Sequence, residues 1–230
     1  MSEQEFRLAI LKLALCFCFG DDEESLSVDQ IVERGLTPIE AYTRYCVTEL
    51  ICHGAVETMH HSPQLNDDVP TAVVIKRSVQ CGLATEEFVY SISRALIDLI
   101  FNSPEYDNFL RLFLEDVKAC ECIEYSLYYG EKSEINIVNP SVFDTKLRLL
   151  ILGCHQEKIH MLLWRAIKKY SISRRAQNIP FSDITNAAFN YYLQYSRGDV
   201  EIERYQRPKV LRSSKLSGML EIFCSSRKQF

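Results

Sequence analysis

The sequence predicts a mainly helical protein whose first third is a small domain of three helices and a β-hairpin. Capping residues and glycines mark short helices before residue 55, and two segments typical of strands follow. Apolar residues then recur with a period near 3.6 through most of the remaining chain. A chain of 230 residues can hold one large or two small domains. We expect residues 1–80 to form the N-terminal domain, 81–140 a helical linker or dimerisation region, and 141–230 a basic helical domain.

The first two helices are predicted from apolar periodicity and from their caps. Residues 3–19 form an amphipathic pattern. Ser27 is suited to the N-cap of the next helix, because Gln30 three residues later completes a capping box. Gly35 is expected to end that helix.

A third helix and a hairpin complete the predicted N-terminal domain. Thr37 has the pattern of an N-cap, with a proline at the first helical position and Glu40 three residues later. Gly54 is expected to end this helix. Residues 55–59 then alternate like a half-buried strand, and residues 71–77 are rich in β-branched side chains.

This order of helix, helix, helix, strand and strand resembles the winged-helix superfamily of helix-turn-helix domains. The resemblance implies that the helix after Thr37 enters the DNA major groove and reads base edges with its outward side chains. We expect its buried side to comprise Ile39, Tyr42, Tyr45, Cys46, Leu50 and Ile51. We expect its outward side to include Glu40, Thr43, Arg44, Val47, Thr48 and Glu49, of which one is basic and two are acidic.

Beyond residue 80 the pattern is almost entirely helical. Thr85, Ser141 and Ser182 are predicted N-caps, and Gly130 and Gly198 are predicted helix ends. The expected helices cover about residues 85–102, 104–129, 142–152, 155–170, 183–197 and 215–223, with short strands at 135–137, 200–205 and 209–212. Two interpretations of residues 142–212 stay open: a helical domain with a hairpin, or a second, degenerate winged helix.

The charge distribution indicates where a polyanion would bind. Residues 1–140 carry 10 Lys+Arg and 24 Asp+Glu, a net charge of −14, whereas residues 141–230 carry 16 and 7, a net charge of +9. Such asymmetry points to nucleic acid or to an oppositely charged protein. Phosphate neutralisation supplies much of the affinity of a DNA-binding protein. Any nucleic-acid affinity is therefore expected mainly in the C-terminal part.

The candidate nucleic-acid-binding residues form three groups. One lies on the third helix and at the end of the hairpin, and two lie in the basic part of the chain. Residues 168–175, with Arg165 one turn earlier, interleave Lys and Arg with Ser and Tyr, and such donors suit phosphate oxygens. The alternative is a solvated helix end, which basic residues also stabilise. The candidates are Arg44, Lys76, Arg77, Arg165, Lys168, Lys169, Arg174, Arg175, Arg207, Lys209 and Arg212.

No pattern in the sequence predicts catalysis, a cofactor or a metal site. The chain has no Gly-rich phosphate loop and no H-E-x-x-H or G-x-S-x-G motif. Its nine cysteines are scattered and lack paired zinc-ligand spacing, so we expect buried free thiols. The apolar segment near the N-terminus follows an acidic leader, which is atypical of a signal peptide. We expect a cytoplasmic, non-catalytic protein without a membrane span.

Two functions fit these observations. The first is a DNA-associated transcriptional or nucleoprotein regulator, which the N-terminal domain positions on DNA and whose helical part forms a homodimer or binds a protein partner. The second is a structural adaptor subunit of a larger nucleic-acid-associated complex. Its winged helix would bind protein, as in the tandem winged-helix subunits that accompany SMC-type ATPases, and only its basic part would face DNA.

Overall fold

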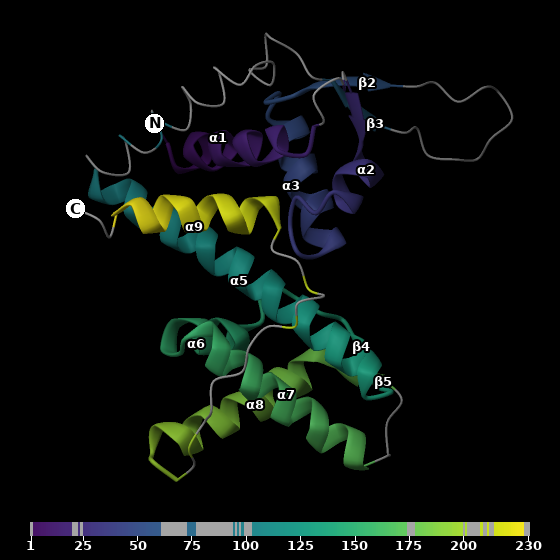
Figure 1. Ribbon diagram of the computed structural model, residues 1–230, viewed down its shortest axis with the longest axis vertical. Coiled ribbons are helices and arrows are strands. Elements are labelled where there is room, and N and C mark those ends of the chain that lie inside the picture. The colour runs from purple at the N-terminus through teal and green to yellow at the C-terminus, as the bar shows by residue number, and fades with distance from the viewer. Residues whose placement is uncertain are drawn as a thin grey trace, which may run out of the picture. The chain divides into compact units, whose positions relative to one another are not determined.

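The computed structural model describes residues 2–19, 23, 25–60, 73–76, 94, 96, 98, 103–173, 178–199, 201, 208, 211 and 214–227. The described chain is mainly helical, as predicted (Figure 1). It forms two compact units, one of Met1–Leu114 with Ser213–Phe230 and one of Glu115–Arg212. Helix α5 (Pro104–Lys132) contributes residues to both units. The three-part division at residues 80 and 140 stays a prediction.

The first unit begins with two helices whose caps agree with the sequence. Helix α1 (Glu3–Cys16) starts at a capping box between Ser2 and Glu5. Helix α2 (Val28–Glu33) starts at the predicted capping box, in which the Gln30 N–H donates to Ser27 Oγ at 3.2 Å. The Ser27 N–H donates in turn to Gln30 Oε1 at 2.8 Å. Gly35 follows α2 with a φ of +69°, a conformation that favours glycine.

The predicted N-cap of the third helix is wrong. Helix α3 (Glu40–Cys52) begins three residues after Thr37, and its N-cap Ile39 makes no side-chain cap bond. The Thr37 hydroxyl instead lies 2.8 Å from Thr43 Oγ1 and donates to the Ile39 carbonyl at 2.9 Å. The Thr37 N–H also donates to Thr43 Oγ1. Thr37 and Thr43 are both buried, so their mutual hydrogen bonds replace the expected capping box.

The predicted buried side of α3 is also partly wrong. Thr43 and Val47, expected to face outward, are buried, whereas Tyr45, expected to be buried, is 51% exposed. The Tyr45 ring stacks on that of Tyr42, with centroids 5.8 Å apart. Thr43, which bonds to Thr37, thus lies on the buried side of the helix. The buried residues of α3 are Tyr42, Thr43, Cys46, Val47 and Leu50.

The predicted hairpin is confirmed in its described residues. Strand β2 (Glu57–His60) pairs antiparallel with β3 (Val73–Lys76), with Glu57 opposite Lys76 and His60 opposite Val73. A short strand β1 (Ser25–Ser27), which the sequence did not predict, pairs with the other edge of β3. The sheet order is therefore β1-β3-β2. Strand β1 attaches the N-terminus of α2 to the hairpin.

The C-terminal helix α9 (Lys215–Arg227) belongs to the first unit and lies beside α1 (Figure 1). The Lys215 and Leu216 N–H groups donate to the Gly35 and Leu36 carbonyls at 2.9 and 3.0 Å. Four apolar side chains of α9 are buried, namely Leu216, Met219, Leu220 and Phe223. They add to a core that α1 supplies with Phe6, Ile10, Leu11, Leu13, Ala14 and Leu15.

The second unit is built from helices and a pair of short strands in its described residues. Helices α6 (Thr145–Gly153), α7 (Gln156–Ser173) and α8 (Phe181–Ser196) follow one another, and α7 packs along α8 (Figure 1). Strand β4 (Asn136–Val138), predicted one residue earlier, pairs parallel with β5 (Asn178–Pro180).

Three predicted boundaries in this unit are wrong. Gly130 lies inside α5, which ends at Lys132, and the buried Ile137 side chain occupies the place where a Cβ of residue 130 would lie. Asp144, rather than Ser141, caps α6, and its Oδ1 accepts from the Leu147 N–H at 2.9 Å. Ser182 lies in the first turn of α8 instead of capping it, because β5 leads directly into this helix through Pro180.

Other predicted elements lie outside the described residues. They are most of the helix expected at 85–102 and the second hairpin expected at 200–212. Only Arg94, Leu96 and Asp98 of the former are described, and all three are helical. Whether residues 142–212 form a second winged helix therefore stays a prediction.

Candidate functional site

The predicted basic residues belong to different units. Arg44 lies on α3 in the first unit, and Arg165, Lys168 and Lys169 lie on α7 in the second. Lys76 occupies the last position of β3, where the structure describes the backbone only. The remaining candidates lie outside the described residues, namely Arg77, Arg174, Arg175, Arg207, Lys209 and Arg212.

Acidic side chains surround Arg44. Its Nε donates to Glu40 Oε1 at 2.8 Å, one helical turn earlier, and its Nη2 donates to Asp29 Oδ1 at 2.6 Å. The hydrogen bond to Glu40, followed by that to Asp29, raises the pKa of the guanidinium. A phosphate would have to compete with two carboxylates for Arg44. The exposed face of α3 therefore lacks the unpaired positive charge that phosphate binding needs.

The cations of α7 have different surroundings. Arg165, Lys168 and Lys169 lie at spacings of three and four residues, so they share one side of the helix. Lys168 Nζ lies 6.0 Å from the centre of the Trp164 ring, and Lys168 and Lys169 are exposed. Within the described part of the chain, Arg165 and Lys169 make no ion pair with a carboxylate.

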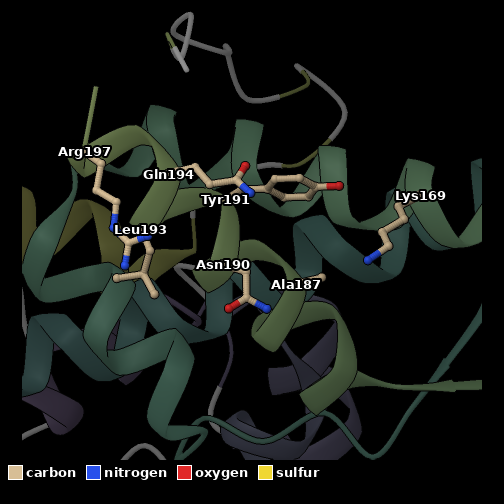
Figure 2. Close-up of a pocket in the computed structure, with 7 residues that line it drawn as sticks. All are labelled: Lys169, Ala187, Asn190, Tyr191, Leu193, Gln194 and Arg197. Atoms are coloured by element: carbon tan, nitrogen blue, oxygen red, sulfur yellow. The ribbon is translucent and has the colours of Figure 1, made fainter. Parts of the chain in front are cut away.

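Lys169 lines a hollow of about 490 Å³ between α7 and α8 (Figure 2). The other lining residues come from α8 and from the residue that follows it. They are Ala187, Asn190, Tyr191, Leu193, Gln194 and Arg197. Figure 2 shows Lys169 and Arg197 at opposite ends, with Asn190, Tyr191 and Gln194 between them. We call these residues the α7–α8 pocket.

Local sequence explains why α8 presents this lining. Ala187, Asn190, Tyr191 and Gln194 recur at spacings of three and four residues, so they share one face of the helix. Ala187 is mostly buried and provides a small side chain, whereas Asn190 and Gln194 are exposed. Gly198, with a φ of +80°, ends the helix after Arg197, as the sequence predicted.

The electrostatic environment of the pocket is positive at both ends. In the described residues, neither Lys169 nor Arg197 forms an ion pair. The acidic residues nearest in sequence are Asp183, one turn before Ala187, and Asp199, two residues after Arg197. The Asp183 carbonyl accepts a hydrogen bond from Tyr170, and burial raises the pKa of that phenol. The pocket thus offers an ammonium, a guanidinium and two amides to an anionic ligand.

Lys169 was predicted from the sequence, whereas Asn190, Gln194 and Arg197 were missed. A signal was present, because these three polar residues repeat at helical spacing with Ala187. A polar stripe of this kind is usually a solvated helix face. Recognising it as one wall of a pocket requires knowing that α7 packs beside it.

The described residues show no alternative site of metal or membrane chemistry. No three His, Cys, Asp or Glu side chains within the described ranges are placed to share a metal ion. His160 is buried, and its ring stacks on that of Tyr125 with centroids 4.3 Å apart. Four cysteines are buried as expected, namely Cys18, Cys46, Cys120 and Cys122, while Cys52 is exposed. No described helix is long and apolar enough to cross a bilayer.

Comparison with known proteins assigns no family. No family model matches the chain, and no significant similarity to a curated protein or to a solved structure is found.

Proposed function

We propose that this protein is a non-catalytic, nucleic-acid-associated adaptor that contacts phosphates through α7 and α8 and binds protein through its N-terminal domain. One contrast carries the proposal. Arg44, the basic residue on the exposed face of α3, is held by Glu40 and Asp29. Lys169 and Arg197 instead lie at the two ends of a polar hollow, and neither pairs with a described carboxylate.

We further propose that the N-terminal domain is a winged helix. Its element order of three helices followed by a hairpin supports this assignment. In such a domain α3 would be the recognition helix. Its exposed face combines the paired Arg44 with the half-exposed Tyr45 ring, and tyrosine is enriched at protein interfaces. This composition favours a protein partner over a DNA groove.

The alternative is the DNA-associated regulator, in which α3 reads a duplex. This alternative requires Arg44 to exchange its carboxylates for phosphates or base edges. The two proposals differ in which unit determines affinity for DNA, and charge reversal therefore distinguishes them.

Binding of a labelled duplex DNA and of a labelled single strand at several salt concentrations tests the proposal. Lys169→Glu should weaken binding and flatten the slope of log K against log salt by roughly 0.9 for each phosphate that is no longer neutralised. Arg44→Glu should change affinity little. Lys132→Glu is the matched control, because it makes the same charge change at an exposed position of the same unit.

Three outcomes count against the adaptor proposal or part of it. Loss of binding in Arg44→Glu with unchanged binding in Lys169→Glu would support the groove-reading regulator instead. An equal effect of Lys169→Glu and Lys132→Glu would indicate unspecific attraction to a positive surface. A wild-type protein that binds neither duplex nor single strand would refute the nucleic-acid role altogether.

A further inference from the structure

We infer that the α7–α8 pocket takes one unstacked nucleotide of a single strand, so that the ligand of this surface is single-stranded rather than duplex nucleic acid. The inference rests on the proposed function and names its ligand. It follows from the shape of the pocket, from the chemistry of its centre and from the charges at its ends.

The shape of the surface favours an unstacked nucleotide. A duplex keeps its base edges inside grooves, which a protein reaches with a protruding helix or ribbon. The α7–α8 pocket does not protrude in this way but is a hollow of about 490 Å³. This volume lies within the range of roughly 300–1,000 Å³ that small-molecule sites occupy. A base enters such a hollow only when it is not stacked in a duplex.

The centre of the pocket offers hydrogen bonds that match a base. Asn190 and Gln194 lie one turn apart on α8, and each amide provides two N–H donors and one oxygen acceptor. Base edges present the complementary mixture of donors and acceptors, which a phosphate lacks. Tyr191, between them in sequence, supplies an aromatic ring of the kind on which unpaired bases stack. Ala187 leaves room for the base because its own side chain is small.

The ends of the pocket carry the positive charges that phosphates of a strand need. A nucleotide within a strand has a phosphate on each side, and Lys169 and Arg197 lie at opposite ends of the lining in Figure 2. Each cation can donate to phosphate oxygens without breaking an ion pair to a described carboxylate. The amides would then select an unpaired base, while the two cations hold the backbone.

Fluorescence anisotropy with a labelled single-stranded DNA of mixed sequence and with its duplex tests the inference. The variants are Asn190→Ala, Lys169→Glu and the matched control Asn186→Ala. Asn186 is an exposed asparagine on the same helix that does not line the pocket. Because all these side chains are exposed, the variants should fold, and circular dichroism verifies this.

We expect the wild type to bind the single strand at least tenfold more tightly than the duplex at the same salt concentration. Asn190→Ala should weaken single-strand binding by about tenfold, leave its salt dependence unchanged and spare duplex binding, because an amide carries no charge. Lys169→Glu should weaken binding of both the single strand and the duplex. For the single strand it should also flatten the slope of log K against log salt by roughly 0.7. Asn186→Ala should behave as the wild type.

Failure of the inference differs from failure of the proposed function. If the duplex binds as tightly as the single strand, or if Asn190→Ala has no larger effect than Asn186→Ala, the nucleotide pocket is refuted while the nucleic-acid role stands. If the wild type binds neither probe, both are refuted.

Discussion

Gly130 provides a sharp test of the packing in the second unit. A Cβ at this position would lie 2.8 Å from Ile137 Cδ1, 2.9 Å from Ile137 Cγ1 and 3.1 Å from the Ile135 carbonyl oxygen. Non-bonded carbon atoms attract one another most at separations of about 3.5–4.0 Å. Ile137 is buried on β4, so it has little room to retreat. Overpacking of this kind costs about 1–3 kcal/mol, against roughly 1 kcal/mol gained by replacing glycine with alanine in a helix.

We therefore expect Gly130→Ala to lower the free energy of unfolding by about 1 kcal/mol, close to the middle of the range that these two effects allow. Gly218→Ala is the matched control. Gly218 also lies in a helix, but no atom lies within 4 Å of its potential Cβ. Gly218→Ala should therefore raise the free energy of unfolding by about 0.5–1 kcal/mol. Urea denaturation followed by circular dichroism measures both, and a Gly130→Ala protein as stable as Gly218→Ala would refute the described packing of Ile137.

Three further changes test the first unit, each by chemical denaturation. Ser27→Ala removes the α2 capping box and should cost about 1 kcal/mol; a change near zero would mean that α2 starts elsewhere. Leu220→Ala should cost about 2–5 kcal/mol, because Leu220 is fully buried in α9; a small loss would show that α9 is not part of the core. Burial raises the pKa of the Cys18 thiol to about 12 from its ordinary 9.0, so the folded state retains a proton that the unfolded state loses. The stability that this neutral thiol contributes is complete below pH 9 and is lost as the pH rises to about 12, so the difference in stability between wild type and Cys18→Ala should narrow over that range.

Local signals in the sequence predicted local structure well. The Ser27 capping box depends only on residues three apart, and its two hydrogen bonds form as expected. Strands β2 and β3 were recognisable because alternation and β-branching are also properties of the segment itself. The helices of both units were found for the same reason.

The errors arise where a distant residue decides. Thr37 has a sequence typical of an N-cap. Its hydroxyl instead forms a hydrogen bond with that of Thr43, because the two residues are buried together. Gly130 looks like a helix end, yet it serves as the contact point for Ile137. Periodicity placed Tyr45 on the buried side of α3, whereas in the structure Thr43, which bonds to Thr37, is buried and Tyr45 is exposed. None of these contacts is visible in the spacing of residues alone.

The candidate site was predicted only in part for a related reason. Lys169 was found through its basic neighbours, since charge clusters are visible in a sequence. Asn190 and Gln194 became part of a site only because α8 packs against α7. Charge can thus indicate a region, while the shape of a pocket depends on tertiary packing.

The place of α9 in the first unit has a consequence for synthesis on the ribosome. The residues of α9 follow the entire second unit in the chain, yet their side chains complete the core that α1 begins. About 100 residues separate the two parts of the first unit. At roughly 5–20 residues per second, their translation takes about 5–20 s. During that interval α9 is not yet available to cover the apolar surface of α1, whereas the second unit can already fold. The N-terminal unit is therefore the last to be completed.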